Sequence, residues 1–330
     1  MAKLKQQCPQ ADANPSLSDD EQTRLDNIVA RWRAERRPKR DVSTSVLDRA
    51  RLFQPTTAPK SINTFDVPDV VPGVCTTSVH GCLGQTEQAL LEAILLRAVD
   101  KGHELKTGGK RIRVKAAALR SDLGITGETG KYTGDLAKSL NRLKEARFRL
   151  ENFGGSWGRP YKRRPAPNVV QGTFIKDWRA KHVSGTGRGN AGDDVMLTIV
   201  LDSAYLLLLR HDQARFRHLR FPTRAFVFGV SMAVARWLMS HDPDEQPNGG
   251  WKPETAIEAV CGELCPARHL GTEKEGSARM HAIRRERSRL ASEPAEIWAA
   301  CGIELRRVGK SFRFELFRDS IGKKEPQAHH

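Results

Sequence analysis

The order of predicted helices and strands occurs twice along this 330-residue chain, and this repetition limits the fold more than any other feature of the sequence. Each half predicts a helix, a short extended segment, a second helix, a basic helix and then two strands. That is the order of a winged helix-turn-helix. The elements repeat, although the two halves share little sequence. The sequence therefore predicts an α+β fold with two tandem winged-helix domains.

The first copy begins at Gln85, where QTEQALLEAILLRAV places apolar residues on one stripe of a helix. KRIRV predicts a short strand, and KAAALRSDLG predicts a helix that ends at Gly124. In KYTGDLAKSLNRLKEARFRLEN three leucines recur at helical spacing and face the core, so the polar residues, Ser139 among them, are expected to face outward. ARFRLENF and NVVQGTFIKDW predict the two strands of a wing.

The second copy begins near Phe221, after a strand and a short apolar helix predicted in DDVMLTIVLDSAYLLLLR. FPTRAFVFGVSMAVARWLMSH predicts a buried helix, GGWKP a short extended piece and ETAIEAVCGELC a second helix. EKEGSARMHAIRRERSRLASE predicts the basic helix, with Met280, Ile283 and Leu290 facing inward. After a final short helix, IELRRVGKSFRFELFR predicts two strands joined around Gly309, which form the second wing.

Four segments follow from these patterns. Residues 1–84 are rich in Pro, Ser, Thr, Asp and Arg, and they predict a flexible N-terminal arm. Residues 85–192 are expected to form the first winged-helix domain with a basic loop. Residues 193–320 are expected to form a linker strand and helix with the second winged-helix domain, and residues 321–330 a disordered tail. Between Gly155 and Gly192 the chain has eight Lys or Arg and one acidic residue, which suits phosphate contacts, with a plain solvated loop as the alternative.

The net charge of +16 implies a polyanionic partner, and nucleic acid is the first candidate. A membrane surface is disfavoured because the sequence has neither an amphipathic membrane helix nor a lipidation signal. The N-terminus has no apolar core of signal-peptide length, so we expect a cytoplasmic protein whose six cysteines stay reduced. Cys261 and Cys265 are spaced to share a helix face, but no CxxC or histidine pair accompanies them, so core thiols are expected rather than zinc ligands.

Three stretches of this sequence resemble the two-winged-helix plasmid replication initiators of the TrfA-like group. They are the reading segment at 119–143, the interdomain segment at 195–241 and the C-terminal helix and wing, and together they cover roughly 85–318. The departure from the family is Gly134, in the first turn of the reading helix, where Gly costs roughly 1 kcal/mol. The family pattern of DLG, an aromatic residue and L-x-R-L is matched by Asp122, Leu123, Gly124, Tyr132, Leu140, Arg142 and Leu143.

The resemblance implies binding to direct repeats (iterons) in a plasmid origin, help in melting an adjacent AT-rich segment, and recruitment of host replication proteins such as the helicase loader or the sliding clamp. It also implies monomers that act on the repeats and a homodimer in solution. In the family a short Leu-Phe motif before the first winged helix docks into the clamp, and Leu52 and Phe53 match its last two positions, while Arg49 and Ala50 depart from it. The alternative is that this pair covers the outside of the first domain.

Each basic helix is expected to lie in a major groove, where Arg or Lys can pair with guanine. The alternative is an ordinary solvated helix face. Wing residues are expected to contact phosphates without reading sequence. The expected DNA-binding residues are Lys131, Tyr132, Thr133, Lys138 and Arg142 in the first basic helix; Arg159, Lys162, Arg163 and Arg164 in the basic loop; Arg279, His281, Arg284, Arg285 and Ser288 in the second basic helix; and Arg306, Arg307, Lys310 and Arg313 in the second wing.

The sequence lacks the residues of the enzymes that act at origins. A nickase needs two closely spaced histidines and a tyrosine nucleophile, but the ten histidines are scattered and the only close pair is His329 and His330. The nearest string to a phosphate-binding loop, KTGGKR, has Arg111 where a hydroxyl is required. No acidic cluster suits a two-metal nuclease. We therefore expect no enzyme activity, no cofactor and no metal.

Winged helices also serve transcriptional repressors and partition-type proteins, so the fold alone does not choose a function. Two unequal reading domains in one chain favour direct repeats, because a homodimer with one module per subunit binds a two-fold symmetric site. This consideration favours the replication initiator over the repressor.

Overall fold

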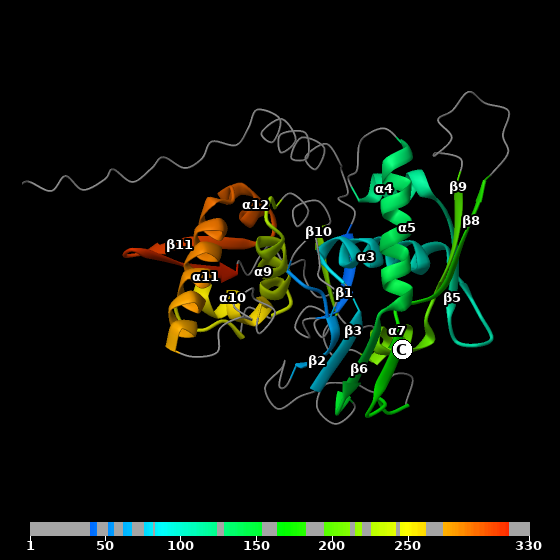
Figure 1. Ribbon diagram of the computed structural model, residues 1–330, viewed down its shortest axis with the longest axis horizontal. Helices are drawn as coiled ribbons and strands as arrows, with labels where there is room; N and C mark the ends of the chain where they lie inside the picture. Colours follow the sequence, from blue (N-terminus) through cyan, green and yellow to red (C-terminus); the bar gives the residue numbers. More distant parts are fainter. Residues whose placement is uncertain are drawn as a thin grey trace, which may run out of the picture. The chain divides into compact units, whose positions relative to one another are not determined.

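The fold is α+β, with helices packed against antiparallel sheets (Figure 1). The computed structural model describes residues 40–44, 52–55, 62–67, 76–81, 83–123, 129–153, 164–182, 195–211, 215–219, 226–241, 245–261 and 273–316. Among the described helices, none has both the length and the apolar character that a membrane span requires.

The segment predicted to form the first winged helix contains its predicted elements in the predicted order. They are α3 (Gln85–Lys101), β5 (Lys110–Lys115), α4 (Ala116–Asp122), α5 (Thr129–Glu145), β6 (Arg147–Glu151) and β7 (Val170–Thr173). β6 and β7 pair antiparallel, as expected of a wing. The leucines of α5 predicted to face inward are buried, so its helical periodicity is confirmed.

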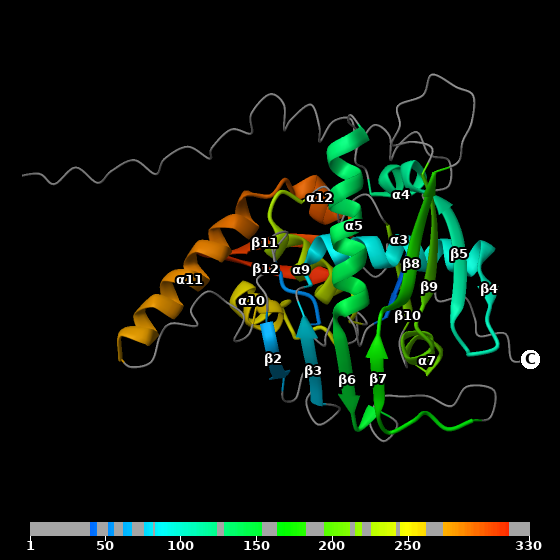
Figure 2. The same ribbon diagram turned by 45° about the vertical axis from the view of Figure 1, so that its right-hand side comes forward.

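The segment NVVQGTFIKDW differs from the prediction, because it does not form one strand. β7 ends at Thr173, and β8 (Ile175–His182) belongs to a different sheet. One sheet has the order β2-β3-β6-β7, and these strands lie side by side in Figure 2. The other has the order β4-β5-β9-β8, with β4 (His103–Glu104) and β9 (Val195–Leu201). α7 (Ser203–His211) follows β9.

The corner between the two sheets is Phe174, whose side chain is fully buried. Its ring centroid lies 5.5 Å from that of Phe53, 4.9 Å from that of Phe148 and 5.5 Å from that of Tyr205. Aromatic pairs at these separations stabilise a core beyond the area they bury. A buried aromatic cluster therefore fixes the point at which the chain leaves one sheet and enters the other.

The segment predicted to form the second winged helix also follows the predicted order. Residue Trp251 forms an antiparallel bridge with Phe314, and their backbone N–H groups donate to each other's carbonyls at 2.9 and 3.0 Å. This bridge adds the short extended piece to the wing hairpin, whose turn contains Gly309 with φ of 61°. The elements are α9 (Gly229–Met239), α10 (Pro253–Cys261), α11 (Glu273–Ser292), α12 (Ala295–Ala300), β11 (Ile303–Val308) and β12 (Ser311–Leu316).

Part of the predicted N-terminal arm is structured, so the expectation of flexibility over residues 1–84 was wrong for these segments. β3 (Thr76–Gly81) pairs with β6, and β2 (Ile62–Val67) pairs with β3, so the two strands extend the sheet that contains β6 and β7. β1 (Arg40–Thr44) pairs with β10 (Arg215–Leu219). Strand pairing with distant segments satisfies backbone groups that these polar sequences leave unpaired on their own. The remainder of the arm and the predicted tail at 321–330 lie outside the described residues.

Leu52 and Phe53, expected to be available to a sliding clamp, are instead core residues, with 1% and 5% of their surface exposed. The N–H of the next residue, Gln54, donates to the carbonyl of Leu83 at 2.8 Å. Both apolar side chains would have to leave the core before they could enter a groove on another protein. The alternative, that the pair covers the outside of the first domain, is closer to the structure, but both residues lie in the core rather than on its outside.

A buried arginine joins α9 to α3. Arg236 donates to Glu92 at 2.8 Å and to Gln85 at 3.0 Å, and all three side chains are buried. Arginine is suited to this position because its planar group serves two acceptors at once. This ion pair specifies how these two helices pack.

We predict that Phe53→Ala lowers the free energy of unfolding by about 3 to 5 kcal/mol, because it removes a ring that contacts Phe174. Val169→Ala is the control, since Val169 is 42% exposed and its loss should cost no more than about 0.5 kcal/mol. Urea unfolding measures both. Equal stabilities for the two variants would show that the Leu-Phe pair is peripheral.

Candidate nucleic-acid interface

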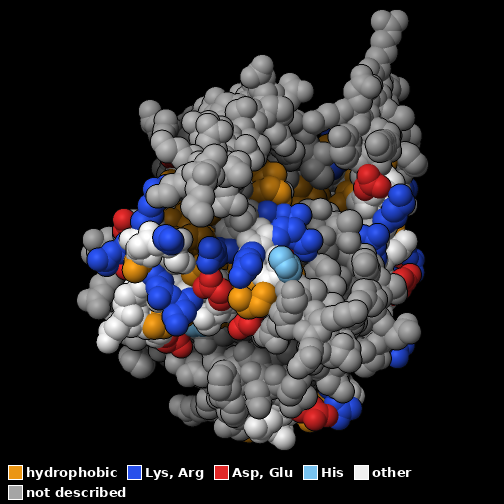
Figure 3. All heavy atoms as spheres, turned by 60° about the vertical axis from the view of Figure 1, so that its left-hand side comes forward, with side chains coloured by type: hydrophobic (Ala, Val, Ile, Leu, Met, Phe, Trp, Pro, Cys, Tyr) orange, Lys and Arg blue, Asp and Glu red, His pale blue; other side chains and the backbone are white. Residues whose placement is uncertain are grey.

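The α11 helix separates a buried face from a cationic one. Ala282, Ile283 and Leu290 are buried, and so is the carboxylate of Glu286. Spacings of three and four residues put these positions on one stripe of the helix. Arg284 and Arg285, which lie between them, are exposed. In Figure 3 Lys and Arg side chains gather on the face of the molecule that is turned forward, with few acidic ones between them.

Glu286 organises two of the arginines on this helix. Its carboxylate accepts from Arg285 at 3.1 Å and from Arg289 at 2.9 and 3.0 Å. Arg289 also lies over the ring of Phe228, with its guanidinium carbon 5.3 Å from the ring centroid. Arg289 is therefore structural, and Arg285 is partly neutralised although its side chain is 54% exposed.

Among the described residues of α11, Arg284 and His281 have the polar groups that are most accessible to a ligand. Both are exposed, and within the described part of the chain no side-chain hydrogen bond or ion pair is found for either. Ser288, also expected to read bases, uses its hydroxyl to donate to the carbonyl of Arg284 at 3.0 Å. Arg279 belongs to α11, but its side chain lies outside the described residues.

Met280 is a correction to the predicted inward face, because 51% of its surface is exposed. The true buried stripe passes through Glu286, a charged residue that an apolar count does not register. The sequence signal that could have identified this stripe is an acidic residue flanked by arginines.

The β11–β12 hairpin adds a second group of cations. Arg306 and Arg313 are direct cross-strand partners and share a face of the hairpin. Arg306 donates to Glu315 at 3.1 Å, so one acidic side chain offsets part of this charge. Arg307 and Lys310 are exposed, with Lys310 in the turn after Gly309. The predicted wing residues are thus brought together on one hairpin.

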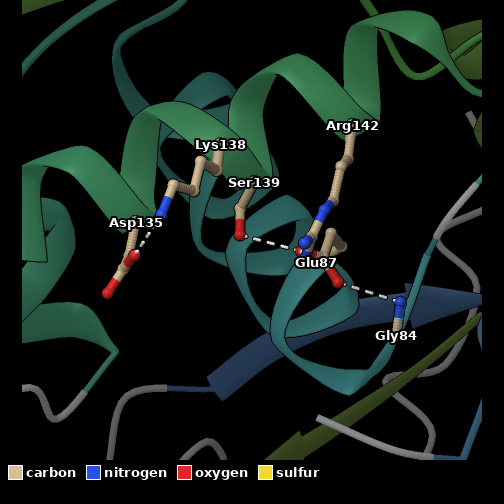
Figure 4. A network of polar contacts seen from close by, with 6 residues as sticks. All are labelled: Gly84, Glu87, Asp135, Lys138, Ser139 and Arg142. Carbon is tan, nitrogen blue, oxygen red and sulfur yellow. Dashed lines mark hydrogen bonds and ion pairs between the residues drawn. The ribbon is translucent and has the colours of Figure 1, made fainter. Parts of the chain in front are cut away.

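In the first domain the central residue is Glu87 of α3, whose side chain is fully buried (Figure 4). Its carboxylate accepts from the Ser139 hydroxyl at 2.8 Å and from Arg142 at 2.9 Å, and its other oxygen accepts from the Gly84 N–H at 2.9 Å. Burial of a carboxylate is tolerated only when such donors satisfy it. Ser139 is therefore buried and does not face outward as predicted. The guanidinium group of Arg142 contacts Glu87 and holds α5 against α3.

The outward face of α5 is less basic than predicted. Lys138 is exposed, but it pairs with Asp135 at 3.3 Å. Asn141, which sequence reasoning missed, is exposed and accepts from the indole N–H of Trp178 at 2.8 Å. Lys131, Tyr132 and Thr133 lie on α5, but their side chains are outside the described residues.

In the basic loop the structure describes one of the expected contact residues, Arg164, which is exposed. Arg159, Lys162 and Arg163 lie outside the described residues, as does Cys265 of the pair considered as zinc ligands. Cys261 is buried and free of a disulfide. Over the described segments, no cluster of three His, Cys, Asp or Glu side chains has a metal-binding arrangement.

Glu293, which follows α11, holds the N-terminus of α9. Its carboxylate accepts from the backbone N–H groups of Phe228 at 3.0 Å and Val227 at 3.2 Å, which fixes α9 against the end of the basic helix. Burial raises the pKa of Glu293, and these two backbone hydrogen bonds oppose the rise. Burial also raises the pKa of the Cys301 thiol, against the opposing charge of Arg236.

Neither a protein-family model nor a curated protein matches this sequence. Two solved structures of RctB domains 2 and 3 are similar to the chain in part. One has a TM-score of 0.41 at 13% identity and covers 82% of this chain and 95% of that one. The other, of selenomethionine derivatives, has a TM-score of 0.37 at 12% identity and covers 82% and 94%. At these values the likeness carries no functional conclusion.

We predict that Arg142→Ala destabilises the protein, because the buried Glu87 carboxylate loses a charged donor. Removing one partner of a fully buried pair costs about 3 to 5 kcal/mol, and we expect about 2 kcal/mol here because solvent reaches part of Arg142. Lys138→Ala removes an exposed charge from the same helix and should cost less than about 0.5 kcal/mol. Denaturant unfolding that ranks the two variants equally would contradict the structural role of Arg142.

The Glu293 carboxyl makes the stability of the protein depend on pH. Because the folded-state pKa of Glu293 is raised above its ordinary value of 4.5, its contribution to stability is fully present below that value and is lost as pH rises through the folded pKa. Glu293→Gln keeps an oxygen acceptor and does not titrate. The stability of the wild type relative to this variant should therefore fall as pH rises from 4 upward. Exposed Glu296→Gln is the control, and a pH-independent difference for Glu293→Gln would refute the assignment.

Proposed function

We propose that this chain is a sequence-specific duplex DNA-binding protein that initiates plasmid replication at repeated origin sequences. The observation that carries the proposal is the exposed cationic face of α11, combined with a basic β11–β12 hairpin in a winged-helix order. A major groove admits a helix of this kind, and its guanines present the N7 and O6 acceptors that arginine pairs with.

The contacts divide into reading and positioning residues. Arg284 and His281 read base edges, since nothing in the described part of the chain occupies their polar groups. Arg307, Lys310 and Arg313 contact phosphates from the wing and set the register of the helix on the duplex. Arg285 contributes less to reading than the sequence suggested, because Glu286 competes for its guanidinium group.

The two domains are unequal, and this supports the initiator over a repressor or partition-type protein. On α5 the exposed Lys138 is paired with Asp135 and Arg142 is bound to Glu87, whereas on α11 the exposed Arg284 has no ion pair among the described residues. One chain with two different modules fits a directional repeat better than a palindrome. In this role the chain helps open the origin and recruits host replication proteins, by surfaces other than Leu52 and Phe53. It acts by binding, without catalysis, cofactor or metal.

A hydroxyl-radical footprint on duplexes selected from a random library tests this function against the alternative. The initiator is supported by repeated protection in one orientation, with one chain covering roughly two helical turns. An inverted repeat protected by two chains supports the repressor.

We predict that Arg284→Ala costs about 1 to 3 kcal/mol of binding free energy on the selected site and relaxes discrimination at one base pair. Random duplex should lose much less affinity. Arg287→Ala is the matched control on the same helix, because its guanidinium group is bound to Glu254 at 3.2 Å and is not expected to read bases. Fluorescence anisotropy measures both. Equal losses on selected and random DNA would demote Arg284 to a phosphate contact.

A further inference from the structure

One face of the sheet of order β4-β5-β9-β8 takes no part in the sequence reading proposed above. α3, α4 and α5 pack against its other face (Figure 1). The side chains of Ile112, Val114 and Ile199 are buried on that inner side. Because neighbouring residues of a strand point to opposite faces, the residues between them point outward.

The outward residues of β5 and β8 are strongly cationic. The strand register places Arg113 and Arg179 on either side of Thr198, and Lys115 and Lys181 on either side of Met196. Arg111 lies opposite Val200 at the end of this grid. Arg111, Arg113, Lys115, Arg179 and Lys181 are all exposed. We call these five residues the sheet cation grid.

Little acidic charge offsets the grid. Asp177 lies on the same face opposite Val200, but it accepts from Lys144 of α5 at 2.9 Å as well as from Arg179 at 3.3 Å. The Lys144 contact, the largest cause, lowers the pKa of Asp177, so it stays ionised. For the other four cations the described residues provide no ion pair. The face therefore keeps a net positive charge near neutral pH.

The spacing of the grid makes the charges act together. Its two rows are separated by two strand widths, about 9.6 Å, and successive residues of a row by about 7 Å. These distances are close to the screening length of about 8 Å at physiological ionic strength, so the cations repel one another in the free protein. A partner that carries regularly spaced negative charge relieves this repulsion.

We propose that the sheet cation grid binds the phosphate backbone of a segment of duplex DNA without reading its sequence. Duplex is favoured over single strands because the outward residues described on β5, β9 and β8 include no aromatic ring on which bases could stack. Trp178, the aromatic residue of β8, pairs in register with buried Ile199 and bonds to Asn141 on the helix side. The grid contacts DNA beyond the part held by α11, and this inference rests on the proposed DNA-binding function but not on sequence reading.

The test uses the full chain and a random-sequence duplex in which no selected site is present. Arg113→Gln/Arg179→Gln removes two grid charges, and Lys106→Gln/Lys252→Gln removes, as the control, two exposed lysines that belong neither to the grid nor to the proposed reading helices and wings. Counterion release gives a slope of about 0.9 per phosphate contact, so the grid variant should flatten log K against log salt by about 2, and the control by much less. Thermal unfolding checks that both variants remain folded.

The outcomes separate this proposal from the proposed function. The grid variant should bind selected and random duplexes more weakly by the same factor, so the ratio of the two affinities stays unchanged. Arg284→Ala, in contrast, changes that ratio. If the wild type bound selected and random duplexes equally well, the proposed sequence-reading function would be wrong. The salt slope would still test the grid. A wild-type slope for the grid variant, an equal change in the control, or a loss confined to a single-stranded oligonucleotide would overturn the grid proposal.

Discussion

The buried carboxylate of Glu87 is the interaction on which the first domain depends. A fully buried negative charge is stable only when donors surround it, and Glu87 takes them from Gly84, Ser139 and Arg142. The first donor lies at the start of α3 and the other two lie on α5, so one residue fixes the orientation of the basic helix. The outward face of α5 follows from these contacts, because Ser139 and Arg142 turn toward that carboxylate and Asn141, which lies between them, is exposed.

The second domain uses buried carboxylates in the same way. Glu286 holds Arg285 and Arg289 on α11, and Glu293 holds the beginning of α9. The described arginines of α11 therefore differ in what their guanidinium groups contact. Arg285 and Arg289 contact the buried Glu286, whereas the exposed Arg284 has no side-chain partner among the described residues and is available to DNA. This difference narrows the proposed reading set on α11 to Arg284 and His281, with Arg285 in a lesser role.

The order of the elements follows from the sequence because the spacing of apolar residues along a helix is a local property, as Leu136, Leu140 and Leu143 of α5 show. Pairing partners are not local, and this is why the sequence did not predict the strands β1, β2 and β3 or the split between β7 and β8. The site was predictable only in part for a related reason. Charged residues such as Arg142 were assigned to solvent, whereas a buried glutamate far along the chain recruits them.

The sheet cation grid was invisible in the sequence because its members come from strands that meet only in the fold. In KRIRV and KDWRAK, alternation with apolar residues identifies strands, but only the register through β9 shows that their cations share one face. The chain thus presents positive charge in two settings, on a helix with free polar groups and on a flat sheet. The first suits base edges, and the second suits a regular backbone.

The central claim is that α11 reads the major groove, and dimethyl sulfate protection measures this most directly because the reagent methylates guanine N7 in that groove. On a selected duplex, the wild-type chain should protect a small set of guanines, and Arg284→Ala should restore reactivity at one of them while the others stay protected. Unchanged guanine reactivity at saturating wild-type protein would contradict the account, because no helix would then occupy the groove.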